Sequence, residues 1–201
     1  DHYGNYCQRL VSPMGQFSIK TSALVETAPT IEVDFSANFV LIQDVPDDVL
    51  LYLLPSRYCE SDKLLAKASE IIYYLSTGYE MVETIRLWVR NNIKYEYNHS
   101  TPSTSAMDTL DSQIGVCRDL SHLAIALCRS INIPARFMVG YLHNLEPMDL
   151  HAWFEAYVGG KWYTFDATQE NTTGGRAVLA YGRDAADVAT MTYFGDLQLD
   201  S

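Results

Sequence analysis

Three residues of this 201-residue chain have side chains that could together perform thiol chemistry: Cys117, His151 and Asp166. Cys117 opens a segment with helical apolar spacing, so we expect it in the first turn of a helix. There, unpaired backbone N–H groups and the positive end of the helix dipole favour thiolate over thiol. A cysteine taken alone is more often a small buried hydrophobe, which is our interpretation of Cys128 in the same segment.

The residues that would act on this thiol lie in a predicted β-hairpin. Residues 151–158 and 161–168 are strand-like, and Gly159-Gly160 between them is a strong signal for a two-residue turn. With such a turn and no bulge in either strand, Val158 pairs with Lys161. This one pairing fixes the register of the whole hairpin.

Counting back along both strands places Trp153 opposite Asp166 and His151 opposite Thr168. His151 and Asp166 then share one face as diagonal neighbours, whose backbones lie about 7–8 Å apart. An aspartate at that position can fix the tautomer of the imidazole and leave its other nitrogen free to take a proton from a thiol. The hairpin therefore predicts a base and its orienter, with Cys117 as the nucleophile.

Three further residues are candidates for lining the site. The backbone N–H of Cys117 is the obvious first donor to an oxyanion, and the Gln113 side chain is a candidate for the second. Tyr95, together with Tyr97, could line the acyl site, although aromatic packing would explain both. Trp153 lies two residues from His151 and either shields the His–Asp pair from water or fills the core.

The remaining elements predict an α+β protein. Residues 1–59 contain β-like runs at 17–20 and 31–35. Apolar spacing predicts a helix from Ser61 that stops at Gly78, and a second helix follows. Beyond the helix of Cys117 come a strand over 137–142 and the hairpin, so helices precede an antiparallel sheet. Arg136 and Glu155 could form an ion pair across neighbouring strands.

At this point the sequence resembles the bacterial transglutaminase-like proteins, a group often described as cysteine proteases. The resemblance covers about residues 61–190 and rests on four ordered motifs: 115–123 (GVCRDLSHL), 132–141 (NIPARFMVGY), 151–156 (HAWFEA) and 162–168 (WYTFDAT). It implies a papain-like α+β core with Cys117, His151 and Asp166 in the roles given above. It also implies that residues 1–59 are the end of a larger β-rich N-terminal domain and that residues 60–201 are the catalytic core.

Two residues after the aspartate depart from the pattern of this family. Ala167 stands where the family commonly has Pro, and Gln169 stands where it commonly has Asn. Neither change alters a catalytic atom, but both could alter the strand end that positions Asp166.

Composition narrows the possible partners. The net charge of −11 argues against nucleic acid and against an anionic membrane surface, because both attract clustered Lys and Arg. The four cysteines form no CxxC pair, and Cys117, His122 and Cys128 point in different directions on one helix, so we expect no metal and no cofactor. The chain has no signal peptide and no initiator Met, which suggests a processed form or fragment, with a cytoplasmic location expected.

The sequence therefore predicts a thiol enzyme that transfers acyl groups from peptide or amide substrates. Hydrolysis, as in a protease or amidase, is favoured over transfer to an amine, because a thioester protected from water needs an apolar tunnel that the sequence does not reveal. A non-catalytic peptide-binding module is the alternative from another class. The substrate and the oligomeric state stay open.

Overall fold

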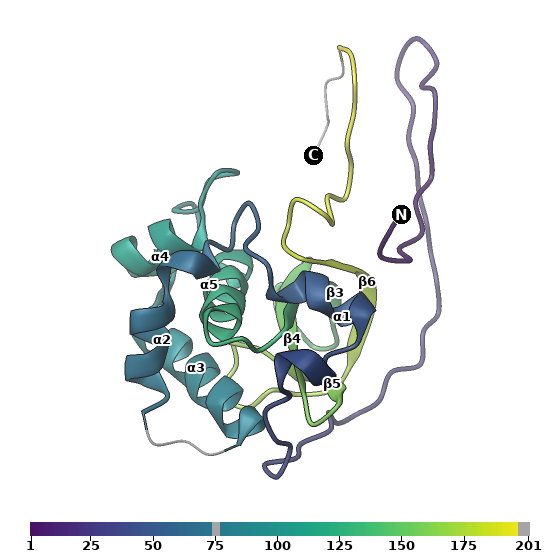
Figure 1. The fold of residues 1–201 in the computed structure, drawn as a ribbon. Coiled ribbons are helices and arrows are strands. Elements are labelled where there is room, and N and C mark those ends of the chain that lie inside the picture. Colours follow the sequence, from purple (N-terminus) through teal and green to yellow (C-terminus); the bar gives the residue numbers. More distant parts are fainter. Residues whose placement is uncertain (74–76, 197–201) are drawn as a thin grey trace.

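A four-stranded antiparallel sheet and the helix that begins at Cys117 form the centre of the molecule. The computed structural model describes residues 1–73 and 77–196. Along the sheet the order is β5-β4-β3-β6, with bounds β3 (Ala135–Leu142), β4 (His151–Val158), β5 (Lys161–Phe165) and β6 (Arg176–Gly182). Helix α5 (Cys117–Ser130) packs on one face of β3 and β4. Most of the other helices gather beyond it, whereas the short helix at Asp47–Leu50 packs against the sheet (Figure 1).

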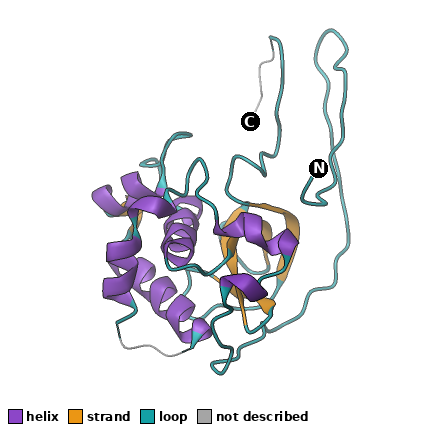
Figure 2. Ribbon diagram, viewed as in Figure 1, coloured by secondary structure: helices purple, strands orange, loops and turns teal. Residues whose placement is uncertain are grey.

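The remaining elements are shorter, apart from one helix. They are η1 (Ile42–Asp44), α1 (Asp47–Leu50), η2 (Leu51–Leu53), η3 (Ser61–Lys63), α2 (Leu65–Ile71), α3 (Gly78–Asn92), β1 (Lys94–Tyr95), α4 (Ala106–Ser112) and β2 (Ile114–Gly115). Figure 2 shows the helices grouped beside the sheet, with loops as the long extensions. The result is the expected α+β architecture.

The core forms because α5 and the sheet are apolar where they meet. On β4 the alternate residues Ala152, Phe154, Ala156 and Val158 face α5 and are buried. Helix α5 is buried along most of its length, including Cys128, which is inaccessible to solvent. This packing fixes the first turn of α5 against the end of the sheet, where β4 begins.

The hairpin has the predicted register. Val158 pairs with Lys161, and the ladder continues to Phe154 opposite Phe165. Gly159 and Gly160 have φ angles of 60° and 86°, the left-handed region that such turns require and that glycine adopts without strain. Strand β5 ends at Phe165, one residue before Asp166.

The predicted helix from Ser61 to Gly78 is wrong in its extent. A 3-10 turn at Ser61–Lys63 and α2 at Leu65–Ile71 replace it, and residues 74–76 lie outside the described part of the chain. Gly78 starts α3 instead of ending a helix, with Thr77 accepting the N-cap hydrogen bond from Glu80 N–H. A Cβ on Gly78 would lie 2.8 Å from the backbone nitrogen of Phe39, so this glycine serves close packing.

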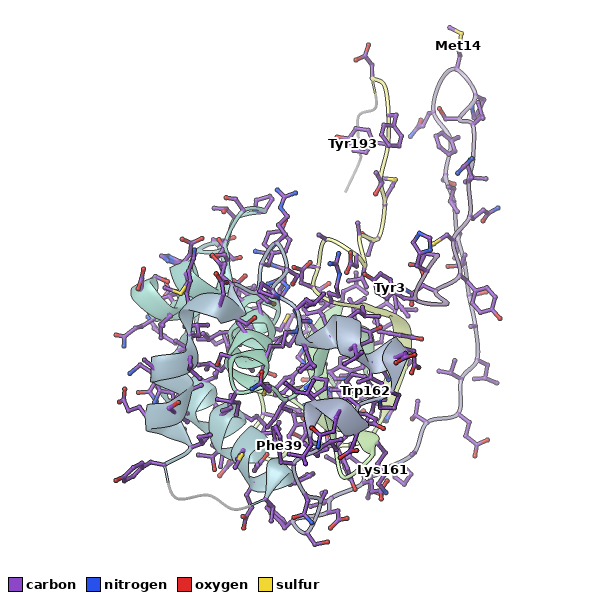
Figure 3. The ribbon with its side chains drawn as sticks, viewed as in Figure 1. Tyr3, Met14, Phe39, Lys161, Trp162 and Tyr193 are labelled. Carbon is purple, nitrogen blue, oxygen red and sulfur yellow. The ribbon has the colours of Figure 1, made fainter. Side chains whose placement is uncertain are left out.

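The β-rich segment expected over residues 1–59 is not observed as strands. The runs at 17–20 and 31–35 have no strand assignment, and the described residues of this segment contain only an isolated bridge between Ser56 and Cys59. A strand is stable only when a neighbour satisfies its backbone groups, and these runs pair with no other strand of the described chain. The first part of this segment extends away from the rest of the molecule, and Figure 3 shows Met14 at the tip of that extension, away from the sheet.

Candidate active site

Helix α5 positions Cys117 through the contacts of its own first turn. Cys117 is the first residue of the helix, and Asp119 accepts the Val116 N–H through Oδ2 at 3.1 Å. Asp119 is fully buried and is also paired with Arg118 at 2.9 Å. These bonds fix the first turn, while Cys117 itself stays partly exposed.

His151 and Asp166 meet as the hairpin register requires. His151 Nε2 lies 2.7 Å from Asp166 Oδ2, and the side chains are 5% and 0% exposed. An ionised carboxylate only accepts hydrogen bonds, so Nε2 carries the proton that the pair shares and Nδ1 remains for another partner. Cys117 lies near enough to the imidazole that its side chain raises the pKa of His151. The structure thus brings Cys117, His151 and Asp166 together.

The charges of this cluster support one another. Burial lowers the pKa of His151, but hydrogen bonds to Asp166 and to Cys117 outweigh it and raise the pKa to about 9. Burial raises the pKa of Asp166, but His151, Arg176 and Thr168 outweigh it and lower the pKa to about 2. The imidazolium and the carboxylate are therefore both charged at neutral pH.

Every oxygen of the Asp166 carboxylate has a donor. Thr168 donates to Oδ1 from its N–H at 2.9 Å and from its hydroxyl at 2.7 Å. Arg176 shares Oδ2 with His151, with its Nη2 at 2.9 Å. Four donors hold the carboxylate in one orientation, which is the requirement for orienting an imidazole.

Helix α3 fixes the loop that carries Asp166. Arg86 is 2% exposed and donates to the carbonyl oxygens of Asp166, Gln169 and Glu170 at 3.2, 2.6 and 3.0 Å. Arg90 donates to the carbonyl of Thr168 at 2.5 Å. Gln169, one of the departures from the family pattern, also accepts from Arg176 through Oε1 at 3.0 Å. The loop is therefore tied to α3, which is distant in sequence, and to the first residue of β6, which follows shortly after it.

Tyr95 lies against the nucleophile. Its strand β1 pairs with β2, with Tyr95 opposite Gly115, two residues before Cys117. The Tyr95 hydroxyl lies beside the backbone N–H and the side chain of Cys117. Burial and the neighbouring Cys117 both raise the pKa of Tyr95. The sequence pointed to Tyr95 as a lining residue, and the structure places it there.

The other two lining candidates lie differently. Trp153 is buried and stacks on His151 with ring centroids 6.1 Å apart, so it shields the imidazole on the sheet side. The Gln113 residue ends α4 in a left-handed conformation, with φ 57°, and is exposed. Its backbone carbonyl accepts the Lys94 N–H at 2.8 Å, and among the described residues its side chain makes no hydrogen bond to Cys117.

Arg176 is the site residue that sequence reasoning missed. It comes from β6, which pairs with β3 and not with the hairpin, so no spacing within the hairpin could reveal it. The guanidinium lies 4.9 Å from the centre of the Trp153 ring and contacts Asp166. The sequence signal that could have found it is an arginine placed directly after the Gly174-Gly175 pair.

Two cavities lie on the sheet face opposite α5, and neither has Cys117 in its lining. The larger, of about 420 Å³, borders Arg136, which stacks on Trp162 and Tyr181 at 4.2 and 4.5 Å. Arg136 is also paired with Glu155 at 2.6 Å, which confirms the predicted cross-strand ion pair. These groups already satisfy one another, and the smaller cavity borders Trp153 and Arg176.

The described residues contain no cluster of three or more His, Cys, Asp or Glu side chains suited to a metal ion. Within the same ranges, no helix is both long and apolar enough to span a bilayer.

Comparison with known proteins agrees with this architecture. The family model for the transglutaminase-like superfamily matches residues 66–167, and the chain belongs to that superfamily. Its solved neighbours include a putative cysteine protease from Cytophaga hutchinsonii, with 44% identity and a TM-score of 0.75. That match covers 80% of this chain and 55% of the other, so this chain spans little more than half the length of that protein.

Curated relatives come from mycobacteria. Protein ML0607 of Mycobacterium leprae is 27% identical over 197 residues, covering 90% of this chain and 69% of that protein. Protein Rv2569c of Mycobacterium tuberculosis is 27% identical over 124 residues, covering 54% of this chain and 40% of that protein. The comparisons thus show the fold and the family of the chain.

Proposed function

We propose that this protein is a thiol-dependent acyl-transfer enzyme acting on amide or peptide bonds, with Cys117, His151 and Asp166 as its triad. The observation that carries the proposal is the position of His151, whose Nε2 lies 2.7 Å from Asp166 Oδ2 and whose imidazole also interacts with the Cys117 side chain. A nucleophile, a base and an orienter in that order are the arrangement that activates a thiol.

The reaction follows from these positions. The Cys117 thiolate attacks the amide carbonyl carbon, the C–N bond breaks, and His151 gives its proton to the departing amine. The acyl group is then held as a thioester on Cys117. In the second half, His151 takes a proton from water as the water attacks the thioester, and the carboxylic acid leaves with the thiol restored.

Two groups are placed to bind the oxyanion formed in each half. The backbone N–H of Cys117 is at the helix terminus, and the Tyr95 hydroxyl lies beside it. A carbonyl oxygen entering between them would accept from both, provided that the hydroxyl turns its proton toward the ligand. Tyr95 is therefore proposed as the second donor in place of Gln113.

Hydrolysis is the better-supported fate of the thioester. Cys117 is partly exposed, and Tyr95 beside it is 40% exposed, so water can reach the acyl group. Transfer to an amine requires that water be kept from the thioester until the amine arrives. The resemblance to the Cytophaga hutchinsonii protein points the same way, through the activity that its name carries.

Cysteine labelling tests the proposal. Cys59 and Cys128 are buried, and burial raises the pKa of Cys59 to about 12 and also raises that of Cys128, so both should react slowly. Cys7 is exposed and would react with any alkylating reagent, so the experiment uses a C7A background. With iodoacetamide near neutral pH, we expect one fast equivalent that maps to Cys117. Uniformly slow labelling would favour a non-catalytic peptide-binding module.

A second experiment separates the two fates of the thioester. Peptides and amide conjugates are incubated with the protein, with and without an added primary amine, and the products are identified by mass spectrometry. Hydrolysis predicts the free acid in both samples. A product joined to the amine, in excess of the acid, would instead identify a transglutaminase-type acyltransferase.

A further inference from the structure

Arg176 makes a contact with the proposed triad that the three triad residues do not explain. Its Nη2 lies 2.9 Å from Asp166 Oδ2, the same oxygen that His151 contacts at 2.7 Å. The Arg176 side chain is only 7% exposed, so the ion pair is little screened by water. One carboxylate oxygen is thus divided between a fixed cation and the imidazole.

Arg176 is held in that place by contacts from two sides. Its Nε donates to the Thr173 carbonyl at 2.9 Å, and Nη2 also donates to Gln169 Oε1 at 3.0 Å. The guanidinium stacks on Trp153, which in turn stacks on His151. A side chain constrained in this way can act on the imidazole only by fixing its neighbours or by altering the charge that it feels.

The surrounding charges indicate which neighbour transmits the effect of Arg176 to the His151 imidazole. The charges that act on His151 are those of Asp166 and Cys117, and Arg176 contributes through Asp166. Glu155 on β4 faces Arg176 as well, but its carboxylate is paired with Arg136. The α3 cations nearest the loop, Arg86 and Arg90, contact carbonyl oxygens and not the carboxylate.

We infer that Arg176 is a positioning residue that fixes the Asp166 carboxylate and limits the strength with which it holds the proton of His151. The inference rests on the proposed function. In the first half of the reaction His151 must release its proton to the departing amine, and an imidazolium held too strongly by an unshared carboxylate is a poorer acid. Arg176 takes part of that negative charge and leaves the orientation of the imidazole unchanged.

The test is an NMR titration of the His151 imidazole in wild type, R176Q and R176K. In R176Q no cation shares the Asp166 carboxylate with the imidazole. The pKa of His151 should therefore rise by about one unit, which is a tenfold change in proton affinity. R176K keeps the positive charge and should titrate close to wild type. R183M removes an arginine that is paired with Asp187 beyond the other end of β6 and should also leave the titration unchanged.

Two results would overturn the inference: a His151 titration in R176Q that coincides with wild type, or an equal shift in R183M. If R176Q does not fold, R176M is measured instead, because it keeps an apolar stem against Trp153. In a D166N background the R176Q shift should vanish, and its persistence would mean that Arg176 does not act through Asp166. A wild-type His151 that titrates near the ordinary histidine value of about 6.5 would also overturn the inference, because Asp166 would then not raise its pKa, whereas the proposed function is tested separately by the labelling of Cys117.

Discussion

Val158 lies opposite Lys161 across a two-residue glycine turn, and this pairing determines where both His151 and Asp166 are placed. A slip of one residue in the register would move every side chain of one strand to the opposite face. Asp166 would then face α5, away from the imidazole. The contact of 2.7 Å between the two side chains is thus a consequence of turn geometry as well as of residue type.

Asp166→Asn should lower turnover by about two to four orders of magnitude with little change in substrate binding. The amide would favour the wrong imidazole tautomer and would remove the charge that stabilises the imidazolium. Steady-state kinetics on a substrate found by the mass-spectrometric screen measures the effect. Asp187→Asn is the matched control, because Asp187 is also paired with an arginine but lies outside the site. Equal losses in both variants would show that some other group orients His151.

Cys117→Ala should abolish activity and leave the fold nearly intact, because Cys117 is partly exposed at the start of α5. Cys128→Ala should do the opposite. Cys128 is fully buried, and its replacement should cost on the order of 1 kcal/mol of unfolding free energy while sparing turnover. Urea unfolding and an activity assay on both variants make the comparison, and wild-type turnover in Cys117→Ala would refute the assignment of the nucleophile.

Cys117 alkylation should stay substantial well below about pH 8.5, the ordinary pKa of a cysteine thiol. The reason is that His151, with its pKa raised to about 9, is a cation beside the thiol over this range. His151→Ala should remove the reactivity on the acidic side. The rate is measured with iodoacetamide in the C7A background, and superimposable curves for the two proteins would contradict a thiolate–imidazolium pair.

Tyr95→Phe should lower turnover by roughly ten- to a thousandfold if the hydroxyl donates to the oxyanion, the range found for loss of one such donor. Cys117 alkylation, which forms no oxyanion, should change much less. Tyr6→Phe is the control, because Tyr6 is a fully exposed tyrosine that likewise loses only a hydroxyl. Unchanged turnover in Tyr95→Phe would show that a group other than Tyr95 is the second donor to the oxyanion.

Local patterns predicted the parts of the site that lie close together in the sequence. The hairpin of β4 and β5 is specified by its glycine turn, and the helix of Cys117 by apolar spacing, so both could be derived without tertiary information. Arg176 could not be derived in this way, because it reaches Asp166 only when β6 pairs with β3. Spacing within a hairpin carries no information about a strand added at the far edge.

The errors in the prediction have the same physical origin. The runs at 17–20 and 31–35 have strand composition, but composition does not supply the neighbouring strand that satisfies the backbone. Gly78 is a helix breaker by propensity, yet its small size admits the backbone of Phe39 at the start of α3. In both cases tertiary contacts, which the local sequence does not encode, decided the outcome.

Two histidines should give the unfolding free energy a maximum near pH 6.5. The pKa of His151 is raised to about 9, so its stabilisation is complete below 6.5 and is lost as the pH rises toward 9. Burial, with the charges of Arg118 and Arg129, holds the pKa of His122 well below 6.5, so only the unfolded chain gains that proton as the pH falls below 6.5. Each histidine should change the free energy by up to about 1.4 kcal/mol per pH unit on its own side.

Urea unfolding between pH 5.5 and pH 8, below the titration of thiols in the unfolded chain, in wild type, His122→Gln and His151→Gln tests this assignment of the two slopes. His122 accepts the Ala185 N–H through Nε2 at 3.1 Å, and a glutamine oxygen can replace that acceptor without titrating. His122→Gln should therefore flatten the acidic side of the curve and leave the alkaline side as in wild type, whereas His151→Gln should flatten only the alkaline side. The range stays above the titration of the carboxylates, so Asp166, with its pKa lowered to about 2, does not contribute. A curve for His122→Gln that falls as steeply below pH 6.5 as that of wild type would show that another group takes up the proton on unfolding.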